Sequence, residues 1–219
     1  MRSKWINRVL SVALLFTTLT TSVSYTFTTA YAEEAGASTQ QSAQSGVSWP
    51  EAPEISAGNG ILIDADTGAI LYEKNAYTKC YPASTTKILT GLLTVENCSM
   101  DETVTFSRAA ANSVTWEDSN LATKVGEQYT VEQALYGLLL YSANEIAEHV
   151  GGSLENFVEM MNARARELGA VNTHFANASG LYDPNHYTTA YDMAMIARGC
   201  YNNSTFVNID STEDTYTIG

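Results

Sequence analysis

Basic residues and cysteines are scarce in this 219-residue chain. It has 11 Lys and Arg against 24 Asp and Glu, a formal net charge of −13. This excess of carboxylates argues against nucleic acid or an anionic membrane surface as a partner, because both repel negative charge. The three cysteines, Cys80, Cys98 and Cys200, allow at most one disulfide, and none has the C-x-x-C or Cys/His spacing of a metal site. We therefore expect neither a disulfide framework nor a metal centre.

The first 32 residues have the features of an export signal. Three basic residues precede an apolar stretch at 9–16, and residues 30–32 (Ala-Tyr-Ala) match the small-x-small cleavage pattern. Residues 17–29 contain too much Thr and Ser for a membrane-spanning helix, which needs about 20 mostly apolar residues. The sequence therefore predicts a signal peptide over residues 1–32 and an exported mature protein.

A low-complexity stretch follows the predicted signal. Residues 33–49 are rich in Ser, Gln, Ala and Gly and have no hydrophobic periodicity, so we interpret them as a flexible linker. Ordered structure is expected from residue 50. The remaining chain, 50–219, is long enough for one domain with a hydrophobic core, or for two small ones.

The order of predicted elements is a β-hairpin and then a block of helices. Residues 60–64 and 69–73 are short apolar runs, separated by turn-forming Asp and Gly. From residue 100 onward the patterns are mostly helical. We expect a helix behind a capping box at 130–133 and a helix at 145–150 ended by Gly151-Gly152. Two further helices are expected, one from a Ser153 cap to Gly169 and one from Thr189 to about Cys200. Residues 205–218 have some strand character.

Two strands alone are marginal in water, so the apolar hairpin implies a larger sheet. The sequence up to residue 219 offers almost no further strands. We therefore expect an α+β fold whose remaining sheet strands lie beyond residue 219.

Ser84 and Lys87 stand three residues apart at the start of a predicted helix, residues 84–96. Pro82 suits a first helical turn, and apolar residues recur behind it at helical spacing. At i and i+3 the hydroxyl and the ammonium share one face of the helix and can meet. Burial lowers the pKa of a lysine, so Lys87 could take the proton of Ser84 and leave a nucleophile. On its own, the pair also fits a helix-capping serine followed by a surface lysine.

Ser142-Ala143-Asn144 is a second polar element, at the junction of two predicted helices. Side chains at such a junction can point into a cleft. A hydroxyl can relay a proton, and an amide can both donate to and accept from a substrate amide. Taken alone, the tripeptide would be interpreted as a helix-breaking polar turn.

Ser-x-x-Lys after a hairpin, followed by Ser-x-Asn within a helical block, is the order found in serine penicillin-recognising enzymes. The flanking segments narrow the resemblance. They are ILIDADTG at 61–68, PASTTK at 82–87, GLYDPNHY at 180–187 and TTAYDMA at 188–194. Over roughly residues 55–219 the chain resembles the D-alanyl-D-alanine carboxypeptidases, the low-molecular-mass penicillin-binding proteins of peptidase family S11. The resemblance implies a β-lactamase/transpeptidase-like α+β fold.

The resemblance also implies a role for each candidate residue. Ser84 would attack the carbonyl between the two terminal D-alanines of a peptidoglycan stem peptide and form an acyl-enzyme, with Lys87 as general base. Ser142 would pass a proton toward the leaving D-alanine, and Asn144 would hold the substrate amide. β-Lactams would acylate Ser84 as inhibitors, and no metal or organic cofactor is required. The implied location is the outer face of a bacterial cell membrane or the cell wall.

One family motif, Lys-Thr-Gly on a sheet strand, is absent from the sequence. Its lysine binds the terminal carboxylate of the substrate in the family, and its strand supplies an oxyanion-hole donor. Loss of one such donor typically costs roughly 100- to 1,000-fold in rate. We therefore interpret residues 50–219 as the N-terminal portion of a carboxypeptidase domain, cut before this motif and before any membrane-anchoring C-terminal tail.

Two other functions stay open. A β-lactamase on the same scaffold would need a carboxylate to activate the deacylating water, and no Glu-x-x-x-Asn follows Ser142-Ala143-Asn144. A non-catalytic penicillin-binding or wall-binding product is the second alternative, motivated by the absent third motif. Ser/His/Asp chemistry is disfavoured, because no Gly-x-Ser-x-Gly elbow accompanies the three histidines.

Overall fold

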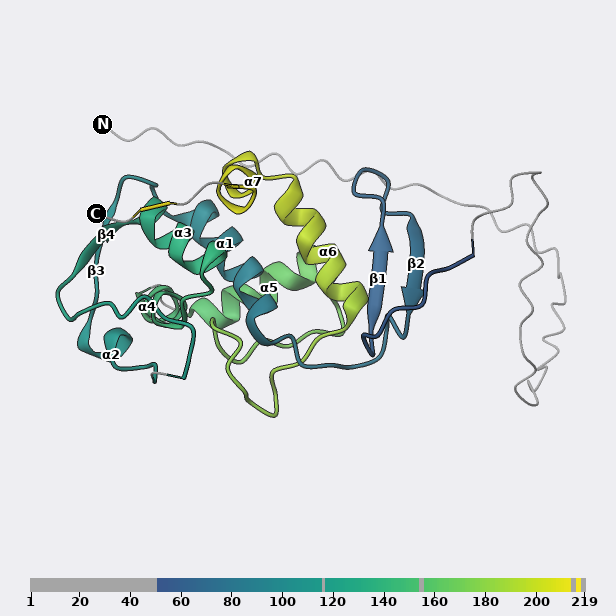
Figure 1. The fold of residues 1–219 in the computed structure, drawn as a ribbon, viewed down its shortest axis with the longest axis horizontal. Coiled ribbons are helices and arrows are strands. Elements are labelled where there is room, and N and C mark those ends of the chain that lie inside the picture. Colours follow the sequence, from purple (N-terminus) through teal and green to yellow (C-terminus); the bar gives the residue numbers. More distant parts are fainter. Residues whose placement is uncertain (1–50, 116, 154–155, 214–215, 218–219) are drawn as a thin grey trace, which may run out of the picture. The chain divides into compact units, whose positions relative to one another are not determined.

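The computed structural model describes residues 51–115, 117–153, 156–213 and 216–217. The predicted signal peptide (1–32) and linker (33–49) lie outside the described residues. Within them, the chain forms a hairpin and a helical block (Figure 1). This arrangement confirms the expected order of elements.

The hairpin consists of β1 (Gly60–Ile63) and β2 (Ile70–Lys74), paired antiparallel with Gly60 opposite Lys74. Asp64 organises the turn: its Oδ1 accepts hydrogen bonds from the Thr67 N–H at 2.7 Å and from the Thr67 hydroxyl at 2.6 Å. These bonds lower the pKa of Asp64 below its usual value. Asp66, Thr67 and Gly68 thus lie in the hairpin turn, where Gly68 has a φ of +77°.

Helix α1 (Thr86–Asn97) lies at the centre of the helical block. Its Leu89 and Leu92 are fully buried, and Gly91 lets the neighbouring helices approach. Five helices contact it: α3 (Val131–Leu140), α4 (Asn144–Ser153), α5 (Phe157–Glu167), α6 (Ala190–Tyr201) and α7 (Ser204–Asp210). The predicted nucleophile helix is therefore also the core of the fold.

A second small sheet and a short helix were not expected. β3 (Thr103–Thr105) pairs antiparallel with β4 (Gln128–Thr130), and α2 (Arg108–Ala111) lies between them in the chain. The predicted capping box is confirmed: the Gln133 N–H donates to Thr130 Oγ1, and the Thr130 N–H donates to Gln133 Oε1. The one residue Thr130 thus ends β4 and caps α3.

The predicted boundary between α4 and α5 is wrong. Gly151 and Gly152 lie inside α4, and Ser153 is its last residue and not a cap. The Ser153 hydroxyl donates back to the His149 carbonyl at 2.7 Å, so it is already used within α4. Gly151 also packs closely, since a Cβ there would lie 3.0 Å from Ala178 Cβ. Tertiary packing thus overrides the helix-ending tendency of the glycine pair.

The strand character expected at 205–218 is also wrong for the described residues of this stretch. Residues Ser204–Asp210 form α7, whose cap is Asn203: its Oδ1 accepts from the Phe206 N–H at 3.0 Å. Phe206 and Ile209 stand three residues apart and are both 3% exposed. The cap and this buried helical face outweigh the β-propensity of the local Thr, Val and Ile residues.

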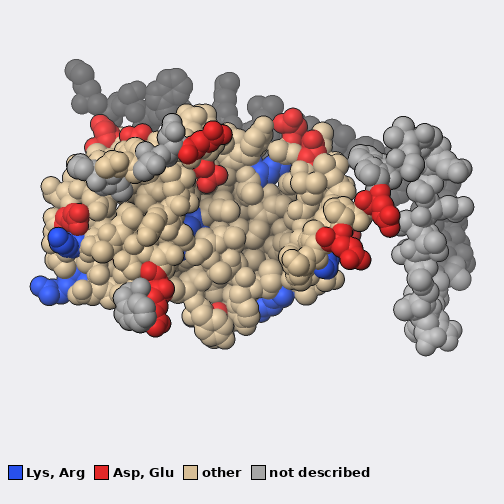
Figure 2. All heavy atoms as spheres, viewed as in Figure 1, with Lys and Arg blue, Asp and Glu red and all other residues tan. Residues whose placement is uncertain are grey.

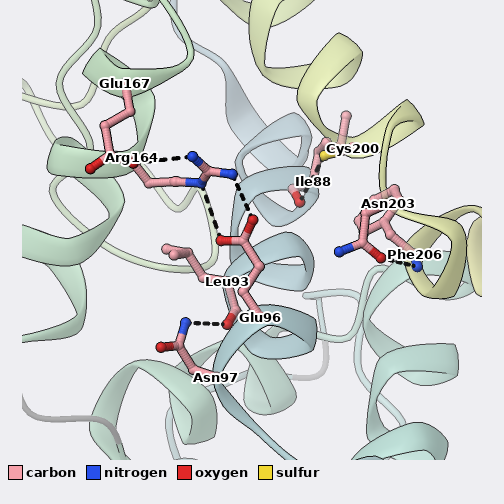
Figure 3. A network of polar contacts seen from close by, with 9 residues as sticks. All are labelled: Ile88, Leu93, Glu96, Asn97, Arg164, Glu167, Cys200, Asn203 and Phe206. Carbon is pink, nitrogen blue, oxygen red and sulfur yellow. Dashed lines mark hydrogen bonds and ion pairs between the residues drawn. The ribbon is translucent and has the colours of Figure 1, made fainter.

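Figure 3 shows a polar network that joins α5 to α1. Arg164 of α5 pairs with Glu96 of α1 at 2.7 Å and with Glu167 at 3.1 Å. The three cysteines are free, and Cys200 is buried against α1, where its Sγ lies 3.8 Å from the Ile88 carbonyl oxygen. No disulfide therefore contributes to the described part of the fold.

Acidic side chains are more prominent than basic ones on the face drawn in Figure 2. This agrees with the net charge of −13. None of the helices in the described part of the chain is long and apolar enough to cross a bilayer.

Candidate active site

Ser84 lies in a 3₁₀ turn (Ala83–Thr85) directly before α1, slightly earlier than the predicted helix start. The Thr85 hydroxyl braces this turn by donating to the Pro82 carbonyl at 2.6 Å. Ala83 has a φ of +49°, a left-handed conformation that is strained for a residue with a side chain. The turn presents Ser84, which is exposed, to a cleft of about 440 Å³.

Lys87 is buried, with 2% of its surface exposed. Its Nζ donates to Asn144 Oδ1 at 2.6 Å, to the Ser179 carbonyl at 2.7 Å and to Ser84 Oγ at 3.3 Å. Burial lowers the pKa of Lys87 to about 8, while the nearby carboxylates of Glu148, Asp118 and Glu145 act in the opposite direction. The surface-lysine interpretation is therefore excluded.

The partners of Lys87 determine what its neutral form can do. A neutral lysine has two N–H bonds and one lone pair. Asn144 Oδ1 and the Ser179 carbonyl are obligate acceptors and hold the closer positions, so they retain the two N–H bonds. The lone pair is then directed at Ser84, whose hydroxyl can donate to it. This arrangement favours proton transfer from Ser84 to Lys87.

Asn144 is the first residue of α4 and is 6% exposed. Its Oδ1 is used by Lys87, and its backbone N–H donates to the Ser119 carbonyl at 2.9 Å. Asn144 also lines the cleft beside Ser84. The group it has left for a ligand is the side-chain NH₂, which donates hydrogen bonds and suits a carbonyl oxygen.

Ser142 makes no side-chain hydrogen bond to the other three residues. Its Oγ is buried and has no hydrogen-bond partner among the described residues, and its φ is +60°. The next residue, Ala143, is fully buried and donates its N–H to the Gly137 carbonyl. The proton-relay role of Ser142 stays a prediction.

The turn at 177–181 holds Lys87 in place and was not identified from the sequence as part of the site. Asn177 Oδ1 accepts from the Gly180 N–H at 2.7 Å, and the Asn177 side chain donates to the Leu181 carbonyl at 2.9 Å. The turn presents two consecutive carbonyls to α1: that of Ala178 to the Thr90 hydroxyl at 2.7 Å and that of Ser179 to Lys87. An Asn-x-x-Gly spacing is the signal that could have indicated this turn.

Gly180 is required by both its conformation and its surroundings. Its φ is +86°, and a Cβ there would lie 1.9 Å from the carbonyl oxygen of Ala83, next to the nucleophile. We expect Gly180→Ala to cost about 2–4 kcal/mol of unfolding free energy, because backbone must move to relieve the clash. Urea denaturation of the two proteins measures this cost.

Gly126→Ala is the matched control, since Gly126 has a φ of +84° but no atom within 4 Å of a built Cβ. It carries the conformational cost alone, about 1 kcal/mol. Equal losses for the two variants would contradict the steric role of Gly180.

His186 supports the same region. The Ala176 N–H donates to its Nδ1 at 3.2 Å, so the proton of the neutral ring lies on Nε2, which donates to Thr86 Oγ1 at 2.8 Å. Burial lowers the pKa of His186. Because the folded state disfavours the charged ring, this stability is present above the ordinary pKa of about 6.5 and is lost as pH falls below it. These contacts give His186 a structural role beside the turn of Ser84.

Glu145 anchors the wall of the cleft formed by residues 117–119. It is fully buried, and its Oε1 accepts from the Leu121 N–H at 2.6 Å. We expect Glu145→Ala to cost about 2–3 kcal/mol, because the Leu121 N–H loses its acceptor in the interior. Glu145→Gln keeps an oxygen acceptor and is expected to cost less than half as much in urea denaturation. Equal losses would show that the Leu121 contact does not matter.

Comparison with known proteins identifies the family. A family model described as D-alanyl-D-alanine carboxypeptidase, peptidase family S11, matches residues 46–217. The chain belongs to the D-alanyl-D-alanine carboxypeptidase family. The carboxypeptidase DacF of Bacillus subtilis is 37% identical over 169 residues, which cover 73% of this chain and 43% of DacF. A carboxypeptidase of Streptomyces sp. is 34% identical over 174 residues, 74% of this chain and 60% of the relative.

Solved structures of the family have the same fold. The D-alanyl-D-alanine carboxypeptidase of Mycobacterium tuberculosis H37Rv superposes with a TM-score of 0.67 at 33% identity, over 72% of this chain and 60% of the other. Penicillin binding protein 6B of Escherichia coli gives 0.69 at 31% identity, over 77% and 57%. These likenesses confirm the expected α+β, penicillin-binding-protein type of fold. The chain spans less than two thirds of the length of these relatives.

Proposed function

We propose that this chain carries the nucleophile and general base of a serine-type D-Ala-D-Ala carboxypeptidase. Ser84 Oγ attacks the carbonyl carbon between the two terminal D-alanines while Lys87 Nζ takes the hydroxyl proton. The C–N bond then breaks, and the proton passes to the leaving D-alanine, with Ser142 as the relay. Water hydrolyses the acyl-enzyme and releases the shortened stem peptide. Asn144 binds the peptide through its NH₂ group.

The observation that carries this proposal is the burial of Lys87 and its hydrogen bonds. A buried lysine with two fixed acceptors, a pKa of about 8 and a serine hydroxyl at 3.3 Å is poised to act as a base near neutral pH. The family names of the relatives agree with this chemistry.

The proposal includes a location and partners. The partner is the D-Ala-D-Ala end of a peptidoglycan stem peptide, with β-lactams as inhibitors that acylate the same serine. The sequence-predicted signal peptide supports export to the outer face of the bacterial membrane or the cell wall.

Incubation of the full-length protein with a fluorescent penicillin, and separately with a peptide ending in D-Ala-D-Ala, tests the proposal. We expect a stable adduct that mass spectrometry maps to the peptide containing Ser84, and release of D-alanine from the peptide. Rapid turnover of the penicillin would favour the β-lactamase alternative. An adduct without release of D-alanine would favour a non-catalytic penicillin-binding protein.

A further inference from the structure

Two segments far apart in the sequence run side by side next to the cleft. Residues 76–82 join β2 to the turn of Ser84, and residues 182–191 lead into α6; both lie along the lower edge of the molecule in Figure 1. Cys80 and Thr188 form an antiparallel bridge, with N–H to O distances of 2.8 and 2.9 Å. The Tyr191 N–H donates to the Ala76 carbonyl at 2.9 Å. The pairing holds the two segments in a fixed register.

Alternate residues of the first segment each contact an aromatic ring of the second. Three such pairs form what we call the aromatic ladder: Tyr77 with Tyr191 (ring centroids 5.0 Å apart), Lys79 with Tyr187 (Nζ to centroid 3.6 Å) and Tyr81 with Tyr182 (centroids 5.6 Å apart). Tyr77 lies in a turn closed by the hydrogen bond from the Thr78 N–H to the Asn75 carbonyl, so the three pairs follow one another in the order of the segments and not at the regular spacing of a strand.

The aromatic ladder is open to solvent and is continuous with the cleft. Tyr77 is 57%, Tyr81 59% and Tyr182 78% exposed. Tyr81 and Tyr182 also line the cleft into which Ser84 points. The Lys79–Tyr187 and Tyr77–Tyr191 pairs follow this pair along the same two segments.

The chemistry of the aromatic ladder suits a sugar chain. Each pair offers a flat apolar ring, and each tyrosine adds a hydroxyl at its edge, so apolar faces and hydrogen-bonding groups alternate. Its one cation, Lys79, lies over the Tyr187 ring, which leaves no concentrated charge to select an ionic ligand. A repeating series of such pairs matches a polymer whose units have flat C–H faces and hydroxyl edges.

We propose that the aromatic ladder binds the glycan strand that carries the stem peptide, so that the preferred substrate is polymeric peptidoglycan and not the free peptide. This proposal rests on the proposed function, since it takes the stem peptide to occupy the cleft. The cleft of about 440 Å³ accommodates the peptide end, and the polymer to which the peptide is attached continues along Tyr81, Lys79 and Tyr77.

Co-sedimentation of the full-length protein with insoluble glycan strands, stripped of their peptides by an amidase, tests the proposal. We expect the wild type to bind and Tyr77→Ala to bind about three- to ten-fold more weakly. Tyr77→Phe keeps the ring and is expected to retain most of the binding. Tyr201→Ala is the matched control, because Tyr201 is also 57% exposed but lies at the end of α6, outside the aromatic ladder. It is expected to bind as the wild type does.

Two results would overturn the proposal. One is a failure of glycan binding to depend on the ladder: either the wild type does not bind stripped glycan, or Tyr77→Ala binds it as well as the wild type does. The other is a weaker affinity of Tyr77→Ala for a soluble stem peptide, which would make the ladder a peptide site. Labelling of Ser84 by fluorescent penicillin on the same samples tests the carboxypeptidase function separately from glycan binding by the aromatic ladder. Ladder-dependent glycan binding without labelling would support the ladder and refute the carboxypeptidase.

Discussion

Ser84→Ala is expected to abolish covalent labelling by a fluorescent penicillin. The substitution removes the hydroxyl that Lys87 is placed to deprotonate, and no acyl bond can form on an alanine side chain. Because Ser84 is exposed and its hydroxyl accepts only a long hydrogen bond of 3.3 Å, from Lys87, among the described residues, we expect the unfolding free energy to change by less than about 0.5 kcal/mol. Gel fluorescence, with urea denaturation of the same sample, measures both quantities.

Ser211→Ala serves as the control, since it removes an exposed hydroxyl far along the chain, at the residue after α7, where that hydroxyl donates to the Val207 carbonyl. It is expected to be labelled as fast as the wild type. Labelling that persists in Ser84→Ala at the wild-type rate would show that another residue is the nucleophile.

The second large effect concerns Lys87 and pH. Only neutral Lys87 can accept a proton, and its pKa is about 8. The labelling rate is therefore expected to rise about tenfold from pH 6 to pH 7 and to level off above pH 8. Stopped-time labelling across this range gives the pH at which the labelling rate is half its maximum.

In Glu145→Gln this midpoint pH is expected to fall, because the Glu145 carboxylate raises the pKa of Lys87.

Lys87→Met and Lys87→Arg separate the base from the charge. Both are expected to lower the labelling rate by about 1,000-fold, the methionine because it has no basic nitrogen and the arginine because it stays protonated.

The folded-state pKa of Lys87 lies below its ordinary value, so the free energy of unfolding contributed by this group increases as pH rises from about 8 to 10.5. Lys87→Met is expected to lose that increase. A labelling rate independent of pH between 6 and 8 would contradict Lys87 as the base.

Local sequence patterns were sufficient to predict an element where turn chemistry or helix capping alone determined its position. The hairpin follows from two apolar runs around an Asp-x-Gly turn, and the capped helix α3 follows from the Thr130–Gln133 spacing. Predictions failed where local propensity competed with packing. Gly151 and Gly152 continue α4 because Gly151 packs against Ala178, and residues 204–210 are helical because Asn203 caps a face that buries Phe206.

The sequence by itself indicated the family, through the order of its motifs and the flanking segments. It also indicated the candidate nucleophile and base, because Ser84 and Lys87 are three residues apart and can share one helical face. It also indicated Asn144, which the fold brings to Lys87 across 57 positions. Only the tertiary structure decided what surrounds the pair. The Ser179 carbonyl, the close approach of Gly180 to Ala83 and the anchor at Glu145 depend on contacts between distant segments. No local pattern encodes such contacts, since packing free energy becomes available only when the segments meet.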